Sequence, residues 1–213
     1  FKGMPEHVVN FLWMIGEEVR ETMATLGMRT VSEMVGRADL LKHDETLRNA
    51  KTKNLDLTPI LTPAFKLPGL MNPNADTHNT QKQDHELEKH IDNTTLLAQC
   101  KSALEHKKPV TISAEIINIQ RSAGTILSHE ISKRYGEEGL PDDTITINFT
   151  GSSGQSAASF LTRGVTMNIV GDSNDGTAKG LCGGKVVVKP DQRNLDRKFV
   201  AEENIITGNV ALY

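Results

Sequence analysis

The sequence is poor in several features that would narrow its function. It has 2 cysteines, Cys100 and Cys182, which lie far apart without a C-x-x-C companion, so neither a disulfide framework nor a zinc site is predicted. A formal net charge of -3 provides no polycationic face for nucleic acid or an anionic membrane. No run of about 18 apolar residues occurs, and the beginning lacks a signal-peptide or transit pattern. We therefore expect an intracellular, cytoplasmic protein without nucleic-acid or membrane partners.

The two ends of the chain look like cuts in a longer polypeptide. The first residue is Phe1 rather than Met, and Tyr213 lies inside the apolar run 209–213. We therefore expect neither to be a natural terminus.

Helices are predicted in the first part of the chain. Apolar residues recur with the 3.6-residue period of an amphipathic helix, which Pro5 would begin and Gly27 would end. A second short helix is expected where Thr30 and Glu33 form a capping box before Gly36. The apolar positions of the first helix are Val8, Phe11, Leu12, Ile15, Val19, Met23 and Leu26.

Residues 52–83 should form an extended linker, because Pro59, Pro63, Pro68 and Pro73 interrupt regular structure. Helical spacing returns between residues 84 and 106, with a break expected near residues 92–93. One or two helices are predicted there.

After residue 108 the pattern changes from helical to period 2, which is typical of strands. Ile145, Ile147 and Phe149 alternate with polar residues. Strand starts near residues 144, 165, 185 and 204 are separated by roughly 21, 20 and 19 residues. Glycines between these strands would form the corners of a solenoid, because glycine adopts positive φ without a steric cost. A β-sandwich is the alternative.

Two groups of possible metal ligands are weak candidates. His85 and His90 are five residues apart, about 140° around a helix, so they read as solvated surface histidines rather than zinc ligands. Asp172 and Asp175 could bind a cation such as calcium, but turn hydrogen bonding is the preferred interpretation.

The other candidate sites also favour structural interpretations. The loop 151–156 lacks the features of a phosphate-binding loop or nucleophile elbow and should be a tight corner. Residues 180–184 precede a strand, unlike a dinucleotide site. Cys182 should pack at a corner, and Arg121 should be buried against carboxylates or backbone carbonyls. From the residues alone, we predict no catalytic, cofactor-binding or metal-binding residue.

Three stretches of the chain share a pattern with a known protein family. The first stretch comprises residues 3–11, 17–20, 26–27, 36–41 and 55–57. The second comprises Asn118, Arg121, Gly124, Ile131 and residues 127–128, 135–136 and 139–141. The third comprises residues 151–156, 160–161, 164–165, 170–172, 174–175, 179–181, 183–184, 186–188, 203–206 and 208–209. Together they resemble the C-terminal third of the glutamate synthase large-chain family. Residues 157 and 176–178 depart from the family pattern, and the likeness does not include roughly residues 71–108.

The resemblance implies a mainly β fold: a right-handed parallel β-helix with about 20 residues per coil, after an α-helical segment and an extended linker. It implies that residues 1–50 end a flavin domain, residues 51–108 form a linker with short helices, and residues 109–213 form a truncated β-helix domain.

The same resemblance implies a non-catalytic brace in an enzyme that makes L-glutamate from glutamine and 2-oxoglutarate. FMN and a 3Fe-4S cluster are implied for the parent enzyme and no cofactor for this fragment. The implied partners are the amidotransferase, central and flavin domains of the same polypeptide, with a reductase subunit or domain as a further candidate. The alternative function is a ligand- or cation-binding β-solenoid module.

Overall fold

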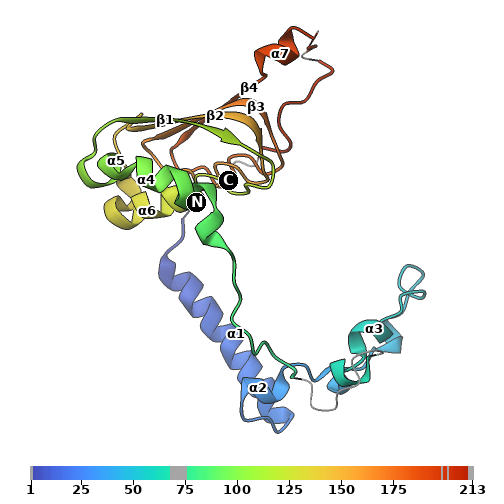
Figure 1. The fold of residues 1–213 in the computed structure, drawn as a ribbon. Coiled ribbons are helices and arrows are strands. Elements are labelled where there is room, and N and C mark those ends of the chain that lie inside the picture. The colour runs from blue at the N-terminus through green and yellow to red at the C-terminus, as the bar shows by residue number, and fades with distance from the viewer. Residues whose placement is uncertain (1, 68–75, 198, 201, 211–213) are drawn as a thin grey trace. The chain divides into compact units, whose positions relative to one another are not determined.

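The structure, a computed structural model, describes residues 2–67, 76–197, 199–200 and 202–210 (Figure 1). The chain divides into two compact units, which we call unit 1 (Phe1–Asp84) and unit 2 (His85–Tyr213). The boundary at residue 84 lies within the stretch 51–108 that was expected to be a linker.

Unit 1 is formed by short helical elements that follow one long helix. As predicted, helix α1 (Pro5–Thr25) has proline in its first turn, and Gly27 follows it with a φ of +71°. The capping interaction of α2 (Val31–Met34) is also confirmed, because the Thr30 hydroxyl accepts a hydrogen bond from the Glu33 amide. The remaining elements are η1 (Ala38–Leu40), η2 (Glu45–Leu47), α3 (Thr58–Leu61) and η3 (Ala64–Lys66).

Two short helical elements therefore occur in the stretch predicted to be an extended linker, α3 around Pro59 and η3 directly after Pro63. The predicted breaks at Pro68 and Pro73 lie outside the described residues. None of the helices in the described ranges is long and apolar enough to cross a membrane.

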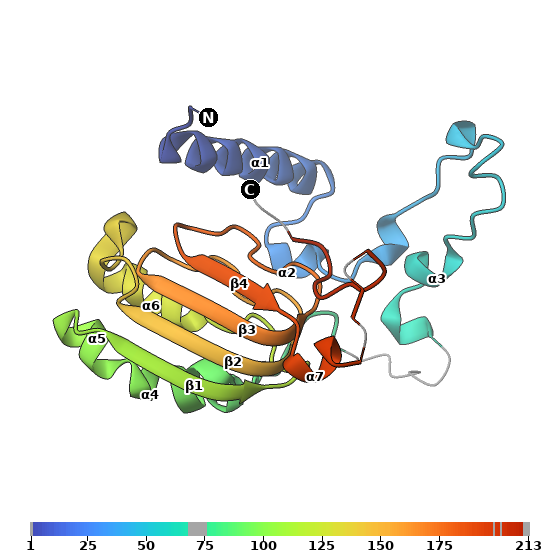
Figure 2. The same cartoon turned by 90° about the horizontal axis from the view of Figure 1, so that it is seen from above.

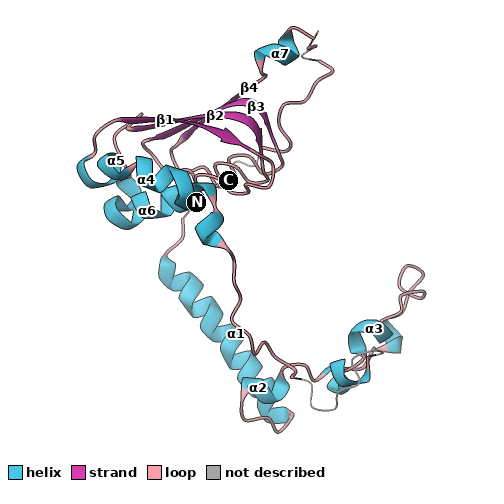
Figure 3. Ribbon diagram, viewed as in Figure 1, coloured by secondary structure: helices cyan, strands magenta, loops and turns pink. Residues whose placement is uncertain are grey.

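Unit 2 combines a parallel sheet with several helices (Figure 3). The strands are β1 (Val110–Ile116), β2 (Ile145–Ser153), β3 (Val165–Ser173) and β4 (Lys185–Lys189). The helical elements are η4 (Leu87–Lys89), the π-helix η5 (Asp92–Leu96), α4 (Leu97–Gln99), α5 (Lys101–His106), α6 (Thr125–Tyr135), η6 (Gly136–Glu138) and α7 (Gln192–Leu195).

The four strands pair in sequence order, β1-β2-β3-β4, and every pair is parallel (Figure 2). Ile147 of β2 lies opposite Ile112 of β1 and Met167 of β3, so alternate apolar residues stack on one face. Three of the four predicted strand starts are confirmed to within one residue. Near the fourth, described residues 202–210 form only isolated bridges, such as Thr207 to Ser173.

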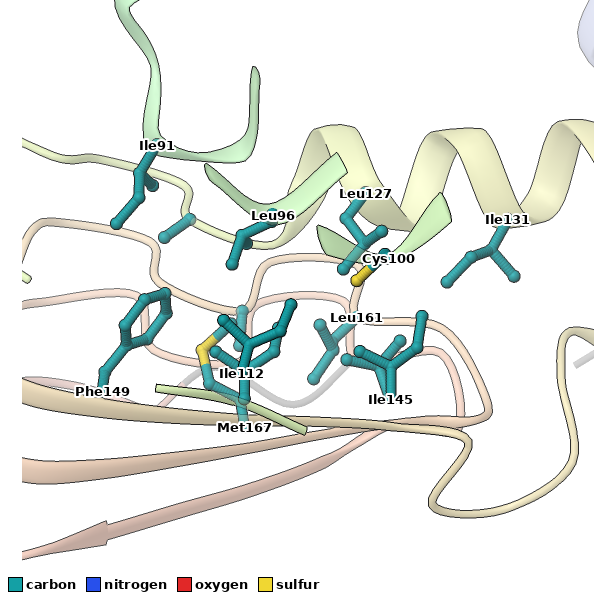
Figure 4. Packing of buried hydrophobic residues seen from close by; sticks show 14 of the residues in the cluster. Ile91, Leu96, Cys100, Ile112, Leu127, Ile131, Ile145, Phe149, Leu161 and Met167 are labelled. Carbon is teal, nitrogen blue, oxygen red and sulfur yellow. The ribbon is translucent and has the colours of Figure 1, made fainter. Parts of the chain in front are cut away.

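The core of unit 2 lies between the sheet and the helices α4 to α6, which cover one of its faces (Figures 1 and 4). Phe149, Ile145 and Ile147 of β2 are fully buried, as are Leu96 and Leu127 on the helical side. Burial of each such side chain contributes roughly 1.5–3 kcal/mol relative to an exposed position. The alternation of apolar and polar residues that predicted the strands therefore arises because only one face of the sheet is covered.

The prediction of a mainly β, right-handed parallel β-helix is wrong. The described residues form one four-stranded parallel sheet with helices on one face, a small α/β arrangement. A helix, α6, lies in the connection from β1 to β2, so these strands are not related by the 20-residue interval. The segments that return from β2 and β3 form isolated bridges rather than strands.

The return segments have a backbone that explains why they are not strands. Alternate residues have positive φ: Ser156, Ala158 and Phe160 after β2, then residues 176, 178 and 180 after β3. Such alternation is incompatible with an extended strand. It nevertheless lets the two segments stack, because the Ala178 amide donates to Ala157 O at 2.9 Å.

Stacking of the corners generates a stability prediction. Ser156 has a φ of +62°, which costs a non-glycine residue about 1 kcal/mol. Ser156→Gly should therefore raise the free energy of unfolding by about 0.5–1 kcal/mol, measured by urea denaturation. Ser152→Gly is the matched control, because Ser152 is an exposed residue of β2 and should lose about as much. A Ser156→Gly protein no more stable than Ser152→Gly would contradict the role of the positive φ.

Candidate functional site: a buried polar centre beside helix α6

Helix α6 begins at a glycine that its surroundings require. Gly124, the N-cap, has a φ of +92°, and a Cβ there would lie 2.8 Å from the Met167 methyl carbon and 3.1 Å from a Leu161 methyl carbon. The positive φ would strain any residue with a Cβ, and glycine has no side chain that could cap the helix. The first amide groups of α6 need an acceptor from elsewhere in the fold.

Asp92, a fully buried residue at the start of η5, supplies that acceptor. Its Oδ1 accepts a hydrogen bond from the Gly124 amide at 2.8 Å, and its Oδ2 accepts one from the Leu127 amide at 3.1 Å. The negative charge also lies at the positive end of the α6 dipole, where it is stabilising. Asp92 thus caps a helix that is distant in sequence, since 32 residues separate it from Gly124.

His90 connects the same centre to the loop before α6. Its Nε2 lies 2.6 Å from Arg121 O, and because a carbonyl only accepts, Nε2 carries the hydrogen. The Nδ1 atom then accepts the Asp92 amide hydrogen at 3.2 Å. These two contacts select one neutral tautomer of the ring.

The prediction of two solvated surface histidines is therefore correct for His85, which is exposed, and wrong for His90. The His90 side chain is only 16% exposed, and its nitrogens bond main-chain groups. The prediction for Arg121 is also wrong, because this residue is exposed and its guanidinium donates to Gln155 Oε1 at 2.6 Å. It is the Arg121 carbonyl that takes part in the polar centre.

A cysteine thiol can act as a catalytic nucleophile, but the buried thiol of this chain is unreactive. Cys100 is buried, and burial together with the Asp92 carboxylate raises its pKa to about 12. The thiolate, which is the reactive form, is thus absent at neutral pH. Cys182 is exposed at the 180–184 corner, where its Sγ lies 2.9 Å from Gly180 O.

Asp172 and Asp175, which were considered as cation ligands, have different surroundings in the structure. Asp175 Oδ1 accepts the Asn209 amide hydrogen at 2.8 Å, so this carboxylate bonds main chain in the neighbouring corner. Asp172 is exposed on β3. Within the described ranges, no group of three or more histidine, cysteine, aspartate or glutamate side chains could hold a metal ion.

The corner predicted over residues 151–156 begins only after residue 153. Residues 151–153 belong to β2, and the chain turns at Gly154, where a Cβ would lie 2.6 Å from Asn118 O and from Gln120 O. Residues 180–184 lead directly into β4. Sequence reasoning missed Asp92 and His90 as a unit, although the break it placed near residues 92–93 falls where η5 begins.

The chain is similar to known proteins over its whole length. The model of the GXGXG motif family matches residues 92–213, a range that begins at Asp92. Over its whole length the chain is 51% identical to "Glutamate synthase [NADH]" of Schizosaccharomyces pombe and 44% identical to "Glutamate synthase [NADPH] large chain" of Bacillus subtilis. It is 38% identical to "Ferredoxin-dependent glutamate synthase 2" of Synechocystis. The chain spans only 10%, 13% and 13% of these relatives.

The polar centre generates a prediction about Asp92. In Asp92→Asn, one carboxylate oxygen becomes an amide nitrogen, so either the Leu127 amide loses its acceptor or the Gly124 amide keeps only its 3.1 Å contact to Oδ2. We expect a loss of about 1–3 kcal/mol in the free energy of unfolding at pH 7. The measurement is urea denaturation monitored by circular dichroism. Asp142→Asn, at an exposed ion pair of the same unit, is the control and should change stability by less than about 1 kcal/mol.

The pH dependence of the same pair of proteins tests the cause. Burial raises the pKa of Asp92 above its ordinary value, although the Gly124 and Leu127 amides lower it. A carboxyl with a raised folded-state pKa binds its proton more tightly when folded, so wild type should gain stability relative to Asp92→Asn as the pH falls toward 3.8. A relative loss on acidification would contradict burial as the dominant cause.

Proposed function

Since the chain belongs to the GXGXG motif family and aligns end to end with glutamate synthase large chains, we propose that unit 2 braces the catalytic domains of such an enzyme. The parent would make L-glutamate from glutamine and 2-oxoglutarate. Its amidotransferase, central and flavin domains would be the partners of this segment. The segment itself would position these domains and perform no chemical step.

The observation that supports this role most directly is how unit 2 uses its buried polar groups. Asp92 caps α6, His90 bonds two main-chain groups, and the Ser153 hydroxyl donates to Ser173 at 2.7 Å. Each contact holds one segment of unit 2 against another. A catalytic site would instead aim such groups at a cleft.

Helix α1 of unit 1 has an exposed apolar surface that another domain of the parent could cover. In the first half of α1, the residues from Val8 to Ile15 are apolar except Asn10, and they are exposed within unit 1. A helix that is apolar on all sides requires a partner that encloses it. We propose that residues 1–50 complete the flavin domain of the parent and that this domain covers α1.

The cofactors implied for the parent do not fit the residues of this chain. An iron–sulfur cluster needs several thiolates, whereas Cys100 is buried with a pKa of about 12 and Cys182 stands apart from it. The N-terminus of α6, a place where a flavin phosphate could bind, already holds the Asp92 carboxylate. We therefore assign FMN and the 3Fe-4S cluster to other parts of the parent.

The names of the relatives bear on the electron donor. Chains named for NADH, NADPH and ferredoxin all align with this segment from end to end. We propose that the segment is common to the three types and does not select the donor. A reductase subunit, where one exists, would then contact other parts of the large chain.

The test compares half-reactions of the full-length enzyme with Phe149→Ala, which removes a fully buried ring from unit 2 and costs about 3–5 kcal/mol of stability. Glutamine-dependent glutamate formation should fall several-fold, because it requires ammonia to pass between braced domains. Glutamine hydrolysis, and glutamate formation from added ammonia, should change much less. Val187→Ala, an apolar truncation at a 47% exposed position of β4, is the control and should change none of these rates.

Phe149→Leu provides a milder variant if the alanine protein does not fold. The brace would be contradicted by equal loss of all three activities in a variant that keeps its flavin absorbance. That result would place groups needed for chemistry in unit 2.

A further inference from the structure

Helix α7 lies near the carboxyl ends of β2 and β3 (Figure 2). Residues of these elements line a groove, which we call the α7 groove. It consists of two adjoining hollows of about 250 Å³ and 290 Å³. Gly171, Asp172, Asn194 and Arg197 line both hollows. The second hollow also contains the apolar residues Phe199 and Ile206.

Two glycines at the carboxyl ends of β2 and β3, Gly151 and Gly171, line the first hollow. Gly151 and Gly171 have φ values of +130° and +144°, and a Cβ on either would overlap a main-chain oxygen of the preceding strand. Other residues are therefore excluded at both positions. Glycine at these two positions is consequently required by the register between β1, β2 and β3.

Some charged side chains of the α7 groove form an ion pair within the described part of the chain, and others do not. Arg193 is satisfied by Asp191, to which its Nε and Nη2 donate at 2.9 and 3.0 Å. Arg197, which follows α7, and Asp172, on β3, are exposed and form no ion pair in the described part of the chain. A cation and an anion therefore line one hollow from different elements without contacting each other.

We propose that the α7 groove binds a free α-amino acid in its zwitterionic form. The carboxylate would pair with Arg197 and the ammonium group with Asp172, and Asn194 lines the same hollow. A simple anion would gain one contact but face the Asp172 carboxylate, and a simple cation would meet Arg197. Only a ligand with both charges satisfies both side chains.

The second hollow adds a preference among amino acids. Phe199 and Ile206 would contact an aliphatic side chain that extends from the charged hollow. L-Leucine should therefore bind more tightly than glycine. This site is independent of the brace role, because none of its residues takes part in the polar centre or the core of unit 2.

The test is titration of the 213-residue chain with L-leucine, glycine, acetate and methylammonium, followed by calorimetry and by amide chemical shifts of Gly171 and Asn194. L-Leucine should bind saturably and at least about tenfold more tightly than acetate or methylammonium, since it makes two charge-assisted contacts. Arg197→Gln and Asp172→Asn should each weaken L-leucine binding by about tenfold. Phe199→Ala should reduce the advantage of leucine over glycine.

The matched controls are Arg163→Gln and Asp142→Asn, which alter an exposed ion pair at the other end of the strands. They should leave binding unchanged. Because Arg197 and Asp172 are exposed, their variants should keep the wild-type circular dichroism spectrum. Two results would overturn the proposal: no saturable shift at Gly171 with any probe, or equal binding of acetate and leucine that Asp172→Asn does not affect.

Discussion

The structure of unit 2 depends on one constraint, the parallel main-chain register that runs from the strands into the segments that follow them. Ile145 pairs with Val165 and Ser153 pairs with Ser173, so β2 and β3 keep a spacing of 20 residues throughout. The register continues beyond the strands, since the Ser156 amide donates to Asp175 O at 2.7 Å. This continuity requires glycine where backbones approach most closely and positive φ at alternate corner residues.

The polar centre attaches the remaining elements to this register. The connection from β1 to β2 contains α6, whose N-cap, Gly124, has positive φ and no side chain that could cap the helix. Asp92 supplies the missing acceptor and thereby fixes the start of η5 against the start of α6. The buried charge is used to hold elements in place, and this use of a carboxylate agrees with a mechanical role better than with catalysis.

Local pattern predicted the elements of this chain better than their assembly. The 3.6-residue period located α1, and alternation located β2 and β3, because both depend on which neighbouring side chains share a face. The β-helix was wrong because the 20-residue interval shows that strands stack but not what covers the sheet. The partners of His90 and Arg121 are a carbonyl and a glutamine that tertiary structure brings near, so no local pattern signals them. Likewise, Arg197 and Asp172 share a hollow only because β3 ends beneath α7.

Native-state hydrogen exchange is the most direct measurement of the central claim that strands and corners form one register. Amides of β3, such as Met167, should exchange with the same opening free energy as the corner amides of Ala158 and Ala178, which donate to neighbouring segments. That result would show that strands and corners open together. Corner amides that exchange several orders of magnitude faster than those of β3 would contradict the account, because the corners would then be loops outside the stacked unit.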